Sequence, residues 1–372
     1  MRVAIGTAIT LGLMKGKMES SPTTAHFLIG EECAHSCAYC SARNSTIARI
    51  EWPEFSLEEV LALPFTKFKR ACLQLTSTGL EEAISLISKI PVPVSVTFRA
   101  ESESEIKSLF SAGADRVCTP LDACTLEISE KVFRGGFVKQ LGLLEWAGKE
   151  FPGKIATHII IGLGERERDS AELLKRLWSF GVYAGLFAFT PAKGSALAGM
   201  EKPHLGAYRR NQIARYLVMK GQTEFSYNLP GQLVGLPKVP AEAFKTSGCP
   251  GCNRPYFDGS PSKPYNYPRE LTSKEYEEAL KQAKIYEGKS VYKAQKLIKI
   301  GIEYSDKIES IKITGDFFVY PEDGLGKIEK NLVSCPVEKE KIQKNIAKTL
   351  NEFEAFGFDA NSLADAIIAA AQ

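Results

Sequence analysis

The sequence predicts an α/β protein: a (β/α) barrel, complete or partial, followed by a cysteine-bearing irregular segment and a small α+β domain. Three observations support this fold class. Short apolar runs alternate with amphipathic stretches over residues 22–203, prolines and glycines dominate residues 221–269, and a hairpin pattern with two helices closes the chain. At 372 residues, the chain suits a barrel of about 250 residues plus a smaller partner domain.

The barrel region holds six strand candidates separated by helical patterns over 56–62, 81–88, 103–112 and 169–180. This alternation favours a parallel sheet, because consecutive parallel strands need a long crossover connection, which is usually a helix. The strand candidates span residues 26–29, 70–75, 92–98, 116–120, 154–161 and 184–189.

The composition excludes several classes of protein. Apolar residues make up 44% and charged residues 24%, as in ordinary globular proteins. A net charge of +3 is too small to indicate nucleic acid or an anionic membrane surface as a partner. No stretch reaches the roughly 20 apolar residues of a membrane span. The apolar segment 3–14 lacks a signal-peptide cleavage site, so we expect it to form a first barrel element or an edge helix in a cytoplasmic protein.

The irregular segment separates the barrel from the last domain. Helical periodicity is absent from residues 221–269, and a C-x-x-C lies inside this stretch at Cys249 and Cys252. Long irregular stretches in compact proteins are usually functional or linkers, and the two cysteines favour function here. A helical pattern then runs from residue 271 to about 287.

The C-terminal region predicts a small α+β domain. Residues 296–304 and 308–320 alternate like a β-hairpin with Ser305-Asp306-Lys307 as its turn. Helical patterns follow over 338–353 and 361–371, the second with Asn361 as its N-cap. The expected division of the chain is a barrel over 1–220, the proline- and glycine-rich segment with its connecting helix over 221–287, and the α+β domain over 288–372.

Three of the nine cysteines form a C-x3-C-x2-C motif at Cys33, Cys37 and Cys40, directly after the first strand. Without an export signal, such spacing favours metal ligation or redox work over disulfides. A four-iron cube normally takes four thiolates, so three in one loop leave one iron open for chemistry. The alternatives are three buried cysteines or a zinc site, but zinc prefers four ligands in paired knuckles and no nearby pair completes the set.

This motif, with Tyr39 just before its last cysteine, resembles the radical S-adenosylmethionine (SAM) superfamily. The resemblance implies a [4Fe-4S] cluster on Cys33, Cys37 and Cys40, with SAM chelating the open iron through its amino and carboxylate groups. Reduction would cleave SAM to a 5′-deoxyadenosyl radical, which abstracts hydrogen from unactivated carbon.

Further stretches resemble the biotin synthase branch of that superfamily. The run from Thr76 to Gly79 follows the second strand, where the family binds the SAM amino group. The stretch from Ile159 to Glu165 resembles a fifth-strand signature that contacts adenine. Asp122 matches a fourth-strand aspartate facing SAM or substrate, and Arg99 is placed to reach a carboxylate; the alternative for both is a salt bridge at the barrel mouth. The expected SAM-binding residues are Tyr39, Thr76, Ser77, Thr78, Gly79, Arg99, Asp122, Ile160, Gly162, Leu163 and Gly164.

The C-x-x-C at Cys249 and Cys252 allows three interpretations. A redox dithiol prefers a helix after a strand, whereas prolines surround this motif. Half a zinc knuckle is the second interpretation, and two ligands of an auxiliary iron–sulfur cluster is the one we favour. Cys72 lies on the second strand, where biotin synthase places one ligand of its second cluster, and is the further candidate ligand. Cys118 and Cys124 are expected to be small barrel hydrophobes.

Biotin synthase itself does not fit, because its other cysteine positions, on strands three and five, hold no cysteine here. Cys335, far along the chain, is expected to be structural.

The C-terminal region resembles a different family. Residues 311–321 contain an I-x-G-D-F-F stretch that resembles the signature of the lipoate–protein ligase C-terminal domain. In that motif Gly315 permits a turn or bulge, Asp316 caps it, and the aromatic pair Phe317-Phe318 packs the hairpin on the helices.

The whole chain thus resembles one subunit of the two-component, archaeal-type lipoyl synthases. That resemblance implies a transferase of lipoate biosynthesis, which inserts sulfur into a protein-bound octanoyl chain. It also implies a second radical SAM subunit, an octanoylated carrier protein and an electron donor such as a ferredoxin as partners. Two alternatives stay open: a biotin synthase-like radical SAM enzyme acting on another small molecule, and a non-catalytic subunit that docks carrier proteins. No residue is assigned a catalytic role.

Overall fold

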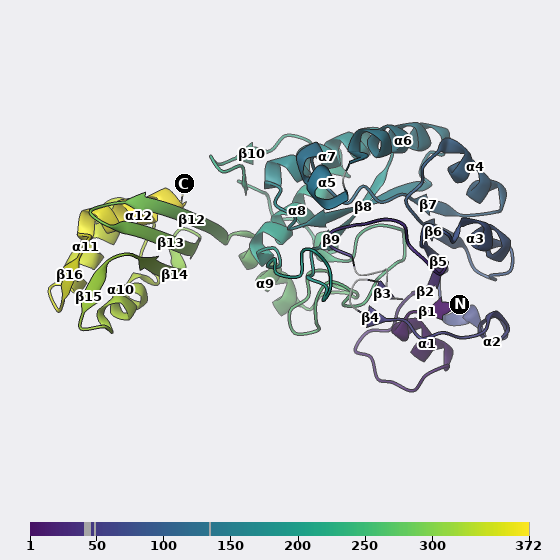
Figure 1. Ribbon diagram of the computed structural model, residues 1–372, viewed down its shortest axis with the longest axis horizontal. Helices are drawn as coiled ribbons and strands as arrows, with labels where there is room; N and C mark the ends of the chain where they lie inside the picture. The colour runs from purple at the N-terminus through teal and green to yellow at the C-terminus, as the bar shows by residue number, and fades with distance from the viewer. Residues whose placement is uncertain (41–45, 48–49, 134, 372) are drawn as a thin grey trace. The chain divides into compact units, whose positions relative to one another are not determined.

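A computed structural model describes residues 1–40, 46–47, 50–133 and 135–371, and it divides into two compact units (Figure 1). The first unit comprises residues 1–203, 210–225 and 235–276, and the second comprises 204–209, 226–234 and 277–372. None of the described helices is both long enough and apolar enough to cross a membrane.

A seven-stranded sheet in the order β1-β2-β5-β6-β7-β8-β9 forms the centre of the first unit. Strand β1 is antiparallel to β2, and every other neighbouring pair is parallel. Among the described residues, β1 and β9 do not pair with each other, and the parallel strands with their crossover helices confirm the predicted α/β class. The strands are β1 Arg2–Val3, β2 Thr24–Ile29, β5 Arg70–Leu75, β6 Val94–Thr97, β7 Arg116–Cys118, β8 Ile155–Ile161 and β9 Tyr183–Ala188.

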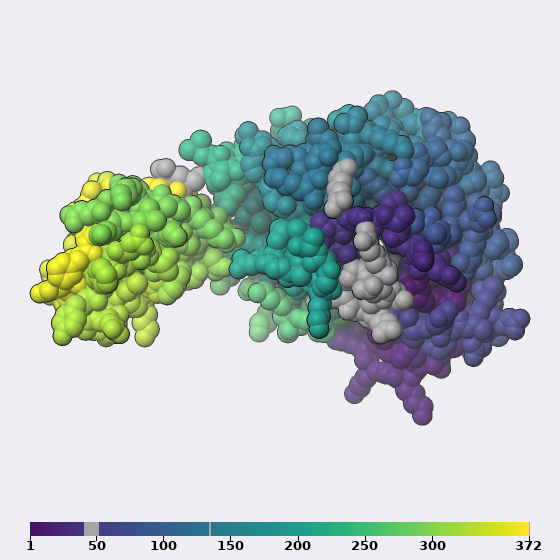
Figure 2. Space-filling model, viewed as in Figure 1, coloured from purple at the N-terminus to yellow at the C-terminus, as the bar shows by residue number. Residues whose placement is uncertain are grey.

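Helices follow the strands as crossover connections and lie on the outer side of the curved sheet (Figure 1). In the space-filling view their blue and teal atoms form the outer surface of this unit (Figure 2). The four expected helical patterns and the edge helix α1 are all present. The helices of this layer and of the N-terminal edge are α1 Ile5–Leu11, α2 Leu57–Leu61, α3 Leu80–Ile87, α4 Glu103–Ser111, α5 Leu126–Phe133, α6 Phe137–Glu150 and α7 Glu167–Ser179.

Serine caps explain where two of these helices begin. The Ser56 and Ser102 hydroxyl oxygens each accept a hydrogen bond from the backbone N–H three residues on, and the Glu59 and Glu105 carboxylates accept one from the N–H of the capping serine. Such capping boxes satisfy backbone donors that the first helical turn leaves free.

A buried ion pair joins α7 to α8 (Leu205–Val218) within the first unit. The Arg210 guanidinium donates to both carboxylate oxygens of Glu167, at 2.7 and 2.8 Å, and the two side chains are only 1% and 7% exposed. Breaking such a pair leaves an uncompensated buried charge.

The irregular segment 235–276 packs within the first unit. It contains the short 3-10 helix η3 (Ala241–Phe244) and the first residues of α9 (Ser273–Ala283). Helix α9 is the expected connecting helix, and it ends at Ala283 rather than near residue 287. Two further pairs of short strands are β3 Thr46–Ile47 with β4 Ile50–Glu51, and β10 Ser226–Tyr227 with β11 Leu233–Val234.

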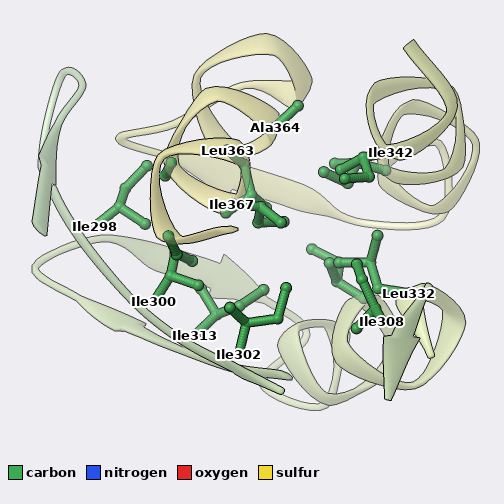
Figure 3. Close-up of a cluster of buried hydrophobic side chains, with 14 of the residues drawn as sticks. Ile298, Ile300, Ile302, Ile308, Ile313, Leu332, Ile342, Leu363, Ala364 and Ile367 are labelled. Carbon is green, nitrogen blue, oxygen red and sulfur yellow. The ribbon is translucent and has the colours of Figure 1, made fainter. Parts of the chain in front are cut away.

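The second unit contains a three-stranded antiparallel sheet, β12-β13-β14, packed against helices around an isoleucine-rich core (Figure 3). The predicted hairpin is β13–β14, whereas the edge strand β12 was not predicted. Its elements are β12 Tyr286–Lys293, β13 Leu297–Tyr304, β14 Ile308–Gly315, β15 Phe318–Tyr320, α10 Gly324–Leu332, α11 Lys339–Leu350, β16 Glu354–Phe356 and α12 Ala360–Ala371.

Two sequence-based expectations for this unit are wrong in detail. The segment 308–320 is not one strand: β14 ends at Gly315, and β15 pairs separately with β16. A Cβ at Gly315 would lie 2.1 Å from the carbonyl oxygen of Leu297, so only glycine fits at this strand end, and the chain bends at the next residue, Asp316. The N-cap of α12 is Asp359 rather than Asn361, because Asp359 Oδ1 accepts the Ser362 N–H at 2.7 Å.

Candidate functional site

A cavity of about 690 Å³ lies along the inner face of the sheet in the first unit. Parallel strands end at one edge of their sheet, and the loops that follow them form the usual ligand site of such folds. Cys33, Cys37, Cys40, Tyr39, Cys72, Thr76, Arg99, Asp122, Ile160, Cys249 and Cys252 line the cavity. Ser77, Thr78, Gly79, Gly162, Leu163 and Gly164 lie outside its lining.

The loop after β5 holds the cysteine loop in place. Ser77 Oγ accepts a hydrogen bond from the Ala34 N–H at 2.8 Å, and Thr78 Oγ1 donates to the carbonyl oxygen of Glu32 at 3.3 Å. On the other side of the loop, the Ala38 N–H donates to the carbonyl of Val132 at 2.8 Å. Ser77 and Thr78 therefore position the protein's own backbone in this structure.

Two glycines allow the cysteine loop and the loop after β5 to approach closely. Gly30 has a φ of +90°, and a Cβ there would lie 2.8 Å from the backbone nitrogen of Gly79. A Cβ on Gly79 would lie 2.6 Å from the carbonyl oxygen of Ile29. Only glycine fits both positions without moving backbone.

Tyr39 and Asp122 form a buried hydrogen bond beside the cysteine loop. The Tyr39 hydroxyl donates to Asp122 Oδ2 at 2.7 Å, and its ring packs edge-on against Phe133 at 5.6 Å. Burial raises the pKa of Asp122 to about 6, although the Tyr39 hydrogen bond and the positive charge of Arg99 oppose the rise. Arg99 lies over the Phe133 ring at 4.6 Å and donates to the Gly135 carbonyl at 3.5 Å, and among the described residues it forms no salt bridge with Asp122.

The three cysteines of the loop lie near one another at the cavity wall. Burial raises the pKa of the Cys37 thiol to about 12, and Asp122, Cys40 and Cys33 add to the rise as neighbouring negative charges. A cation bound at these sulfurs would favour the thiolates, which are the metal-binding form of cysteine. The grouping of three thiols at one cavity wall therefore fits an iron–sulfur cluster.

Among the described residues, no three His, Cys, Asp or Glu side chains converge on a position for a single metal ion. An iron–sulfur cluster takes its ligands at separate irons and does not require such convergence.

The Gly162-Leu163-Gly164-Glu165 stretch forms a closed loop beside the cavity. The Glu165 carboxylate accepts the N–H groups of Gly162 and Leu163, at 2.6 and 2.9 Å. Ile160, two residues before the loop, lines the cavity. The conformation of this loop thus depends on the chain's own glutamate, and its glycines have φ values of +106° and +111°.

A second group of thiols lies deeper along the strands. Cys72 on β5, Cys249 and Cys252 line the same cavity, and all nine cysteines of the chain are free. Burial raises the pKa of Cys72 to about 12, with Cys249 and Cys252 as its next largest influences. We refer to Cys72, Cys249 and Cys252 as the deep thiol group. The structure thus places the three cysteines near one another although they are far apart in the sequence.

The C-x-x-C loop is fixed to strands on both sides of the cavity. The Leu186 N–H on β9 donates to Ser247 Oγ at 2.8 Å, and Asn253 Oδ1 accepts the Thr23 N–H beside β2 at 2.9 Å. Arg254, just after the motif, lies over the Phe187 ring at 3.7 Å and donates to the Ser247 carbonyl at 2.9 Å.

Four residues at the deep thiol group were missed by sequence reasoning: His26, Thr24, Arg70 and Arg116. His26 Nε2 lies 3.8 Å from Cys252 Sγ, and Thr24, His26 and Arg70 line the cavity. Burial raises the pKa of Cys252, but His26 and Arg254 outweigh it and lower the value to about 6. The sequence did hold a signal for three of them, because each is a histidine or arginine on an otherwise apolar strand. On β5 and β7 the arginine lies two residues before a cysteine, so the two side chains are on the same face of the sheet.

The remaining cysteines lie away from the cavity surface. Cys118 is 1% exposed and outside the lining, although Cys249 and Cys72 lie near enough to raise its pKa after the larger effect of burial. Cys124 is buried in the first unit, and Cys335 belongs to the core of the second.

No family model matches the chain, and no curated protein does. A solved structure from the bi-partite lipoate protein ligase and E2 lipoyl domain system of Thermoplasma acidophilum is 27% identical, covering 22% of this chain and 96% of that one, with a TM-score of 0.21. Methylornithine synthase (PylB) is 14% identical over 54% of this chain and 62% of its own, with a TM-score of 0.43.

The FeFe-hydrogenase maturase HydG from Carboxydothermus hydrogenoformans is 17% identical over 54% of this chain and 52% of its own, with a TM-score of 0.42. The chain thus spans about half the length of HydG and under two thirds of methylornithine synthase. These TM-scores are too low to support an argument about function. The function is therefore argued from the chain's own residues.

Proposed function

We propose that this chain is a radical SAM enzyme that inserts sulfur into a protein-bound octanoyl chain, as one subunit of a two-component lipoyl synthase. One observation carries the proposal: the C-x3-C-x2-C thiols and the deep thiol group line one cavity. When bound, the first cluster and SAM supply a hydrogen-abstracting radical, and an auxiliary cluster supplies sulfide. Cys33, Cys37 and Cys40 would hold the first cluster, and Cys72, Cys249 and Cys252 the second.

The chain's own residues position the substrate and form an apolar space between the two proposed clusters. A radical on an alkyl chain needs exclusion of water and of other hydrogen donors. Tyr39 fixes the Asp122 carboxylate at the cavity wall through its 2.7 Å hydrogen bond, and the raised pKa of Asp122 favours the neutral acid more than in an ordinary aspartate. Apolar side chains form much of the wall, including those of Ile5, Ile9, Met18, Leu28, Phe98, Phe133, Phe187 and Phe189.

The octanoyl substrate is proposed from the resemblance of residues 311–321 to the lipoate–protein ligase domain and from the apolar cavity. In the second unit, Phe317 packs edge-on against Phe358 at 4.8 Å, which gives the motif a role in the core of this unit. We propose that this unit docks the carrier protein. We also propose that the chain works with a second radical SAM subunit and receives electrons from a ferredoxin-like protein.

Iron analysis tests the two-cluster arrangement. Anaerobically prepared protein should hold about eight irons and eight sulfides per chain, falling to about four of each in a Cys249→Ala/Cys252→Ala variant. A Cys124→Ala/Cys335→Ala variant is the matched control and should keep the full content. Zinc in place of iron, or iron content unchanged by the first variant, would contradict the proposal.

Product analysis tests the reaction. Reduced protein with SAM should form 5′-deoxyadenosine faster with an octanoyl-lysyl peptide than with an acetyl-lysyl peptide. A subunit that only docks carrier proteins would cleave no SAM under either condition. Equal stimulation by both peptides would favour a radical SAM enzyme for another small molecule.

A further inference from the structure

The deep thiol group has a nitrogen donor beside it. His26 lies on β2 directly opposite Cys72 on β5 in the parallel register, so both side chains emerge on the same face of the sheet. The same row continues through Ser95 on β6 to Arg116 on β7. His26 Nε2 lies 3.8 Å from Cys252 Sγ, so the imidazole reaches a thiol of the C-x-x-C loop, while Cys72 is the neighbour of His26 in the sheet row.

Three buried donors beside this group have no hydrogen-bond partner among the described residues. They are Thr24 Oγ1, Arg70 Nη1 and Arg116 Nη1. The other Nη of Arg70 is paired with Asp115, so one arm of this guanidinium is used and one is free. Arg70 and Arg116 are both close enough to Cys249 to lower its pKa against the larger effect of burial.

Unsatisfied buried donors are rare in native proteins and usually indicate a missing partner. The two guanidinium groups share the single carboxylate of Asp115, so one positive charge remains uncompensated and one Nη of each lacks a partner among the described residues. These donors and the hydroxyl call for an anionic partner, and an iron–sulfur cluster with thiolate ligands is such an anion. These orphaned donors are an observation independent of the cysteines. They indicate that the floor of the cavity is built to hold a negatively charged group at the deep thiols.

We propose that His26 is an iron ligand of the auxiliary cluster, through Nε2, beside Cys72, Cys249 and Cys252. This inference rests on the auxiliary cluster of the proposed function and adds a ligand to it. A neutral imidazole in place of a thiolate leaves the cluster less negative and raises its reduction potential. Arg70 and Arg116 act in the same direction, because nearby positive charge favours the reduced state.

Two other residues compete for this role. Cys118 neighbours the deep thiol group but is 1% exposed and does not reach the cavity surface. His158 lines the cavity, but its ring packs against Phe187 at 4.5 Å. Cys118 and His158 therefore provide matched controls for His26.

Pulsed electron paramagnetic resonance on the auxiliary cluster alone tests the proposal. A Cys33→Ala/Cys37→Ala/Cys40→Ala variant of the full chain removes the first cluster and should keep about four irons. After reduction, the remaining cluster should show a strong nitrogen coupling that changes when histidine is labelled with ¹⁵N. A nitrogen that only donates a hydrogen bond to sulfur couples much more weakly.

The ligand variants then assign the nitrogen. In the same background, His26→Cys should keep the iron, because a thiolate replaces the imidazole, but should lose the nitrogen coupling and shift the potential downward. His158→Gln and Cys118→Ala should keep both the iron and the coupling. A coupling that survives in His26→Cys, or a parent variant with iron and no strong nitrogen coupling, overturns the inference alone. A parent variant that binds no iron overturns the auxiliary cluster, and with it both proposals.

Discussion

Replacing Gly79 with alanine should weaken SAM binding at the cysteine loop while leaving the deep thiol group intact. The added Cβ would lie 2.6 Å from the Ile29 carbonyl oxygen, whereas ordinary contact begins at 3.4 Å. The backbone at Gly79 and the Ile29 carbonyl must therefore move apart by about 0.8 Å. Neither is the flexible end of a side chain, so this movement costs free energy. The hydrogen bond from Ala34 to Ser77 and that from Thr76 to the Ile29 carbonyl lie at this junction.

The size of the effect follows from the cost of overpacking. Inserting a methyl group into a closely packed site typically costs about 1–3 kcal/mol. If the loop that holds SAM bears this cost, the dissociation constant for SAM rises roughly 5- to 150-fold, since each 1.4 kcal/mol is a factor of ten. Equilibrium dialysis with labelled SAM under anaerobic conditions measures this change, with iron content determined in parallel.

Gly142 on α6 provides the matched control. A Cβ at Gly142 has no heavy atom within 4 Å, so Gly142→Ala should bind SAM normally and gain roughly 0.5–1 kcal/mol of helix stability. If Gly79→Ala binds SAM within twofold of the parent chain at full iron content, the close approach of the two loops does not shape the SAM site.

Three further predictions concern stability. Arg210→Met removes the guanidinium that pairs with the buried Glu167 carboxylate and should cost about 3–5 kcal/mol in urea denaturation. Lys131→Met, in the exposed Lys131–Glu127 pair, should cost under about 0.5 kcal/mol, and similar losses in the two variants would contradict the buried role. Glu275→Gln should cost less than about 1 kcal/mol of stability at pH 7, because the ion pair of Glu275 with Arg269 is partly exposed. The Arg269 hydrogen bond lowers the pKa of Glu275 to about 2, so the stability difference between parent and variant should disappear as the pH falls from 4.5 through 2. A stability difference that persists below pH 2 would refute this origin. Phe317→Ala should lower the melting temperature of the second unit, whereas Phe318→Ala should not, because Phe318 is 73% exposed; equal effects in calorimetry would refute the assignment.

Six strands of the seven-stranded sheet could be predicted because each is a short apolar run with loops on both sides, whereas the two-residue strand β1 was not among the candidates. Strand β12 could not, since its sequence Tyr286–Lys293 is mostly polar. It is an edge strand, and every second residue toward its end is exposed, so neither an apolar run nor a helical period marks it. The aromatic pair at Phe317 and Phe318 was only half predicted, because the turn after Gly315 directs one ring into the core and leaves the other exposed.

The cysteine loop and the deep thiol group differ in how well the sequence alone could predict them. Cys33, Cys37 and Cys40 lie within one loop, so their spacing alone indicates a shared ligand. The residues around the deep thiol group come from separate strands and a later loop, and no spacing in the sequence relates them. The parallel register places His26, Cys72 and Arg116 on one row across the sheet, and that register depends on pairing between distant segments.

The register also fixes the separation of the two proposed groups along the strands. Cys72 lies four residues before Thr76, which lines the cavity beside the cysteine loop, and four residues of strand span about 13 Å. The carbon that loses its hydrogen must itself bond to sulfide, so the proposal requires the alkyl chain to lie in the cavity between the two levels, within reach of both groups. The apolar walls of the cavity, with Phe98 and Phe187 among them, favour a chain without polar groups. Replacing either phenylalanine with a polar side chain should therefore reduce 5′-deoxyadenosine formation with the octanoyl-lysyl peptide more than SAM cleavage without any peptide, and equal losses would show that the substrate does not pass between these walls.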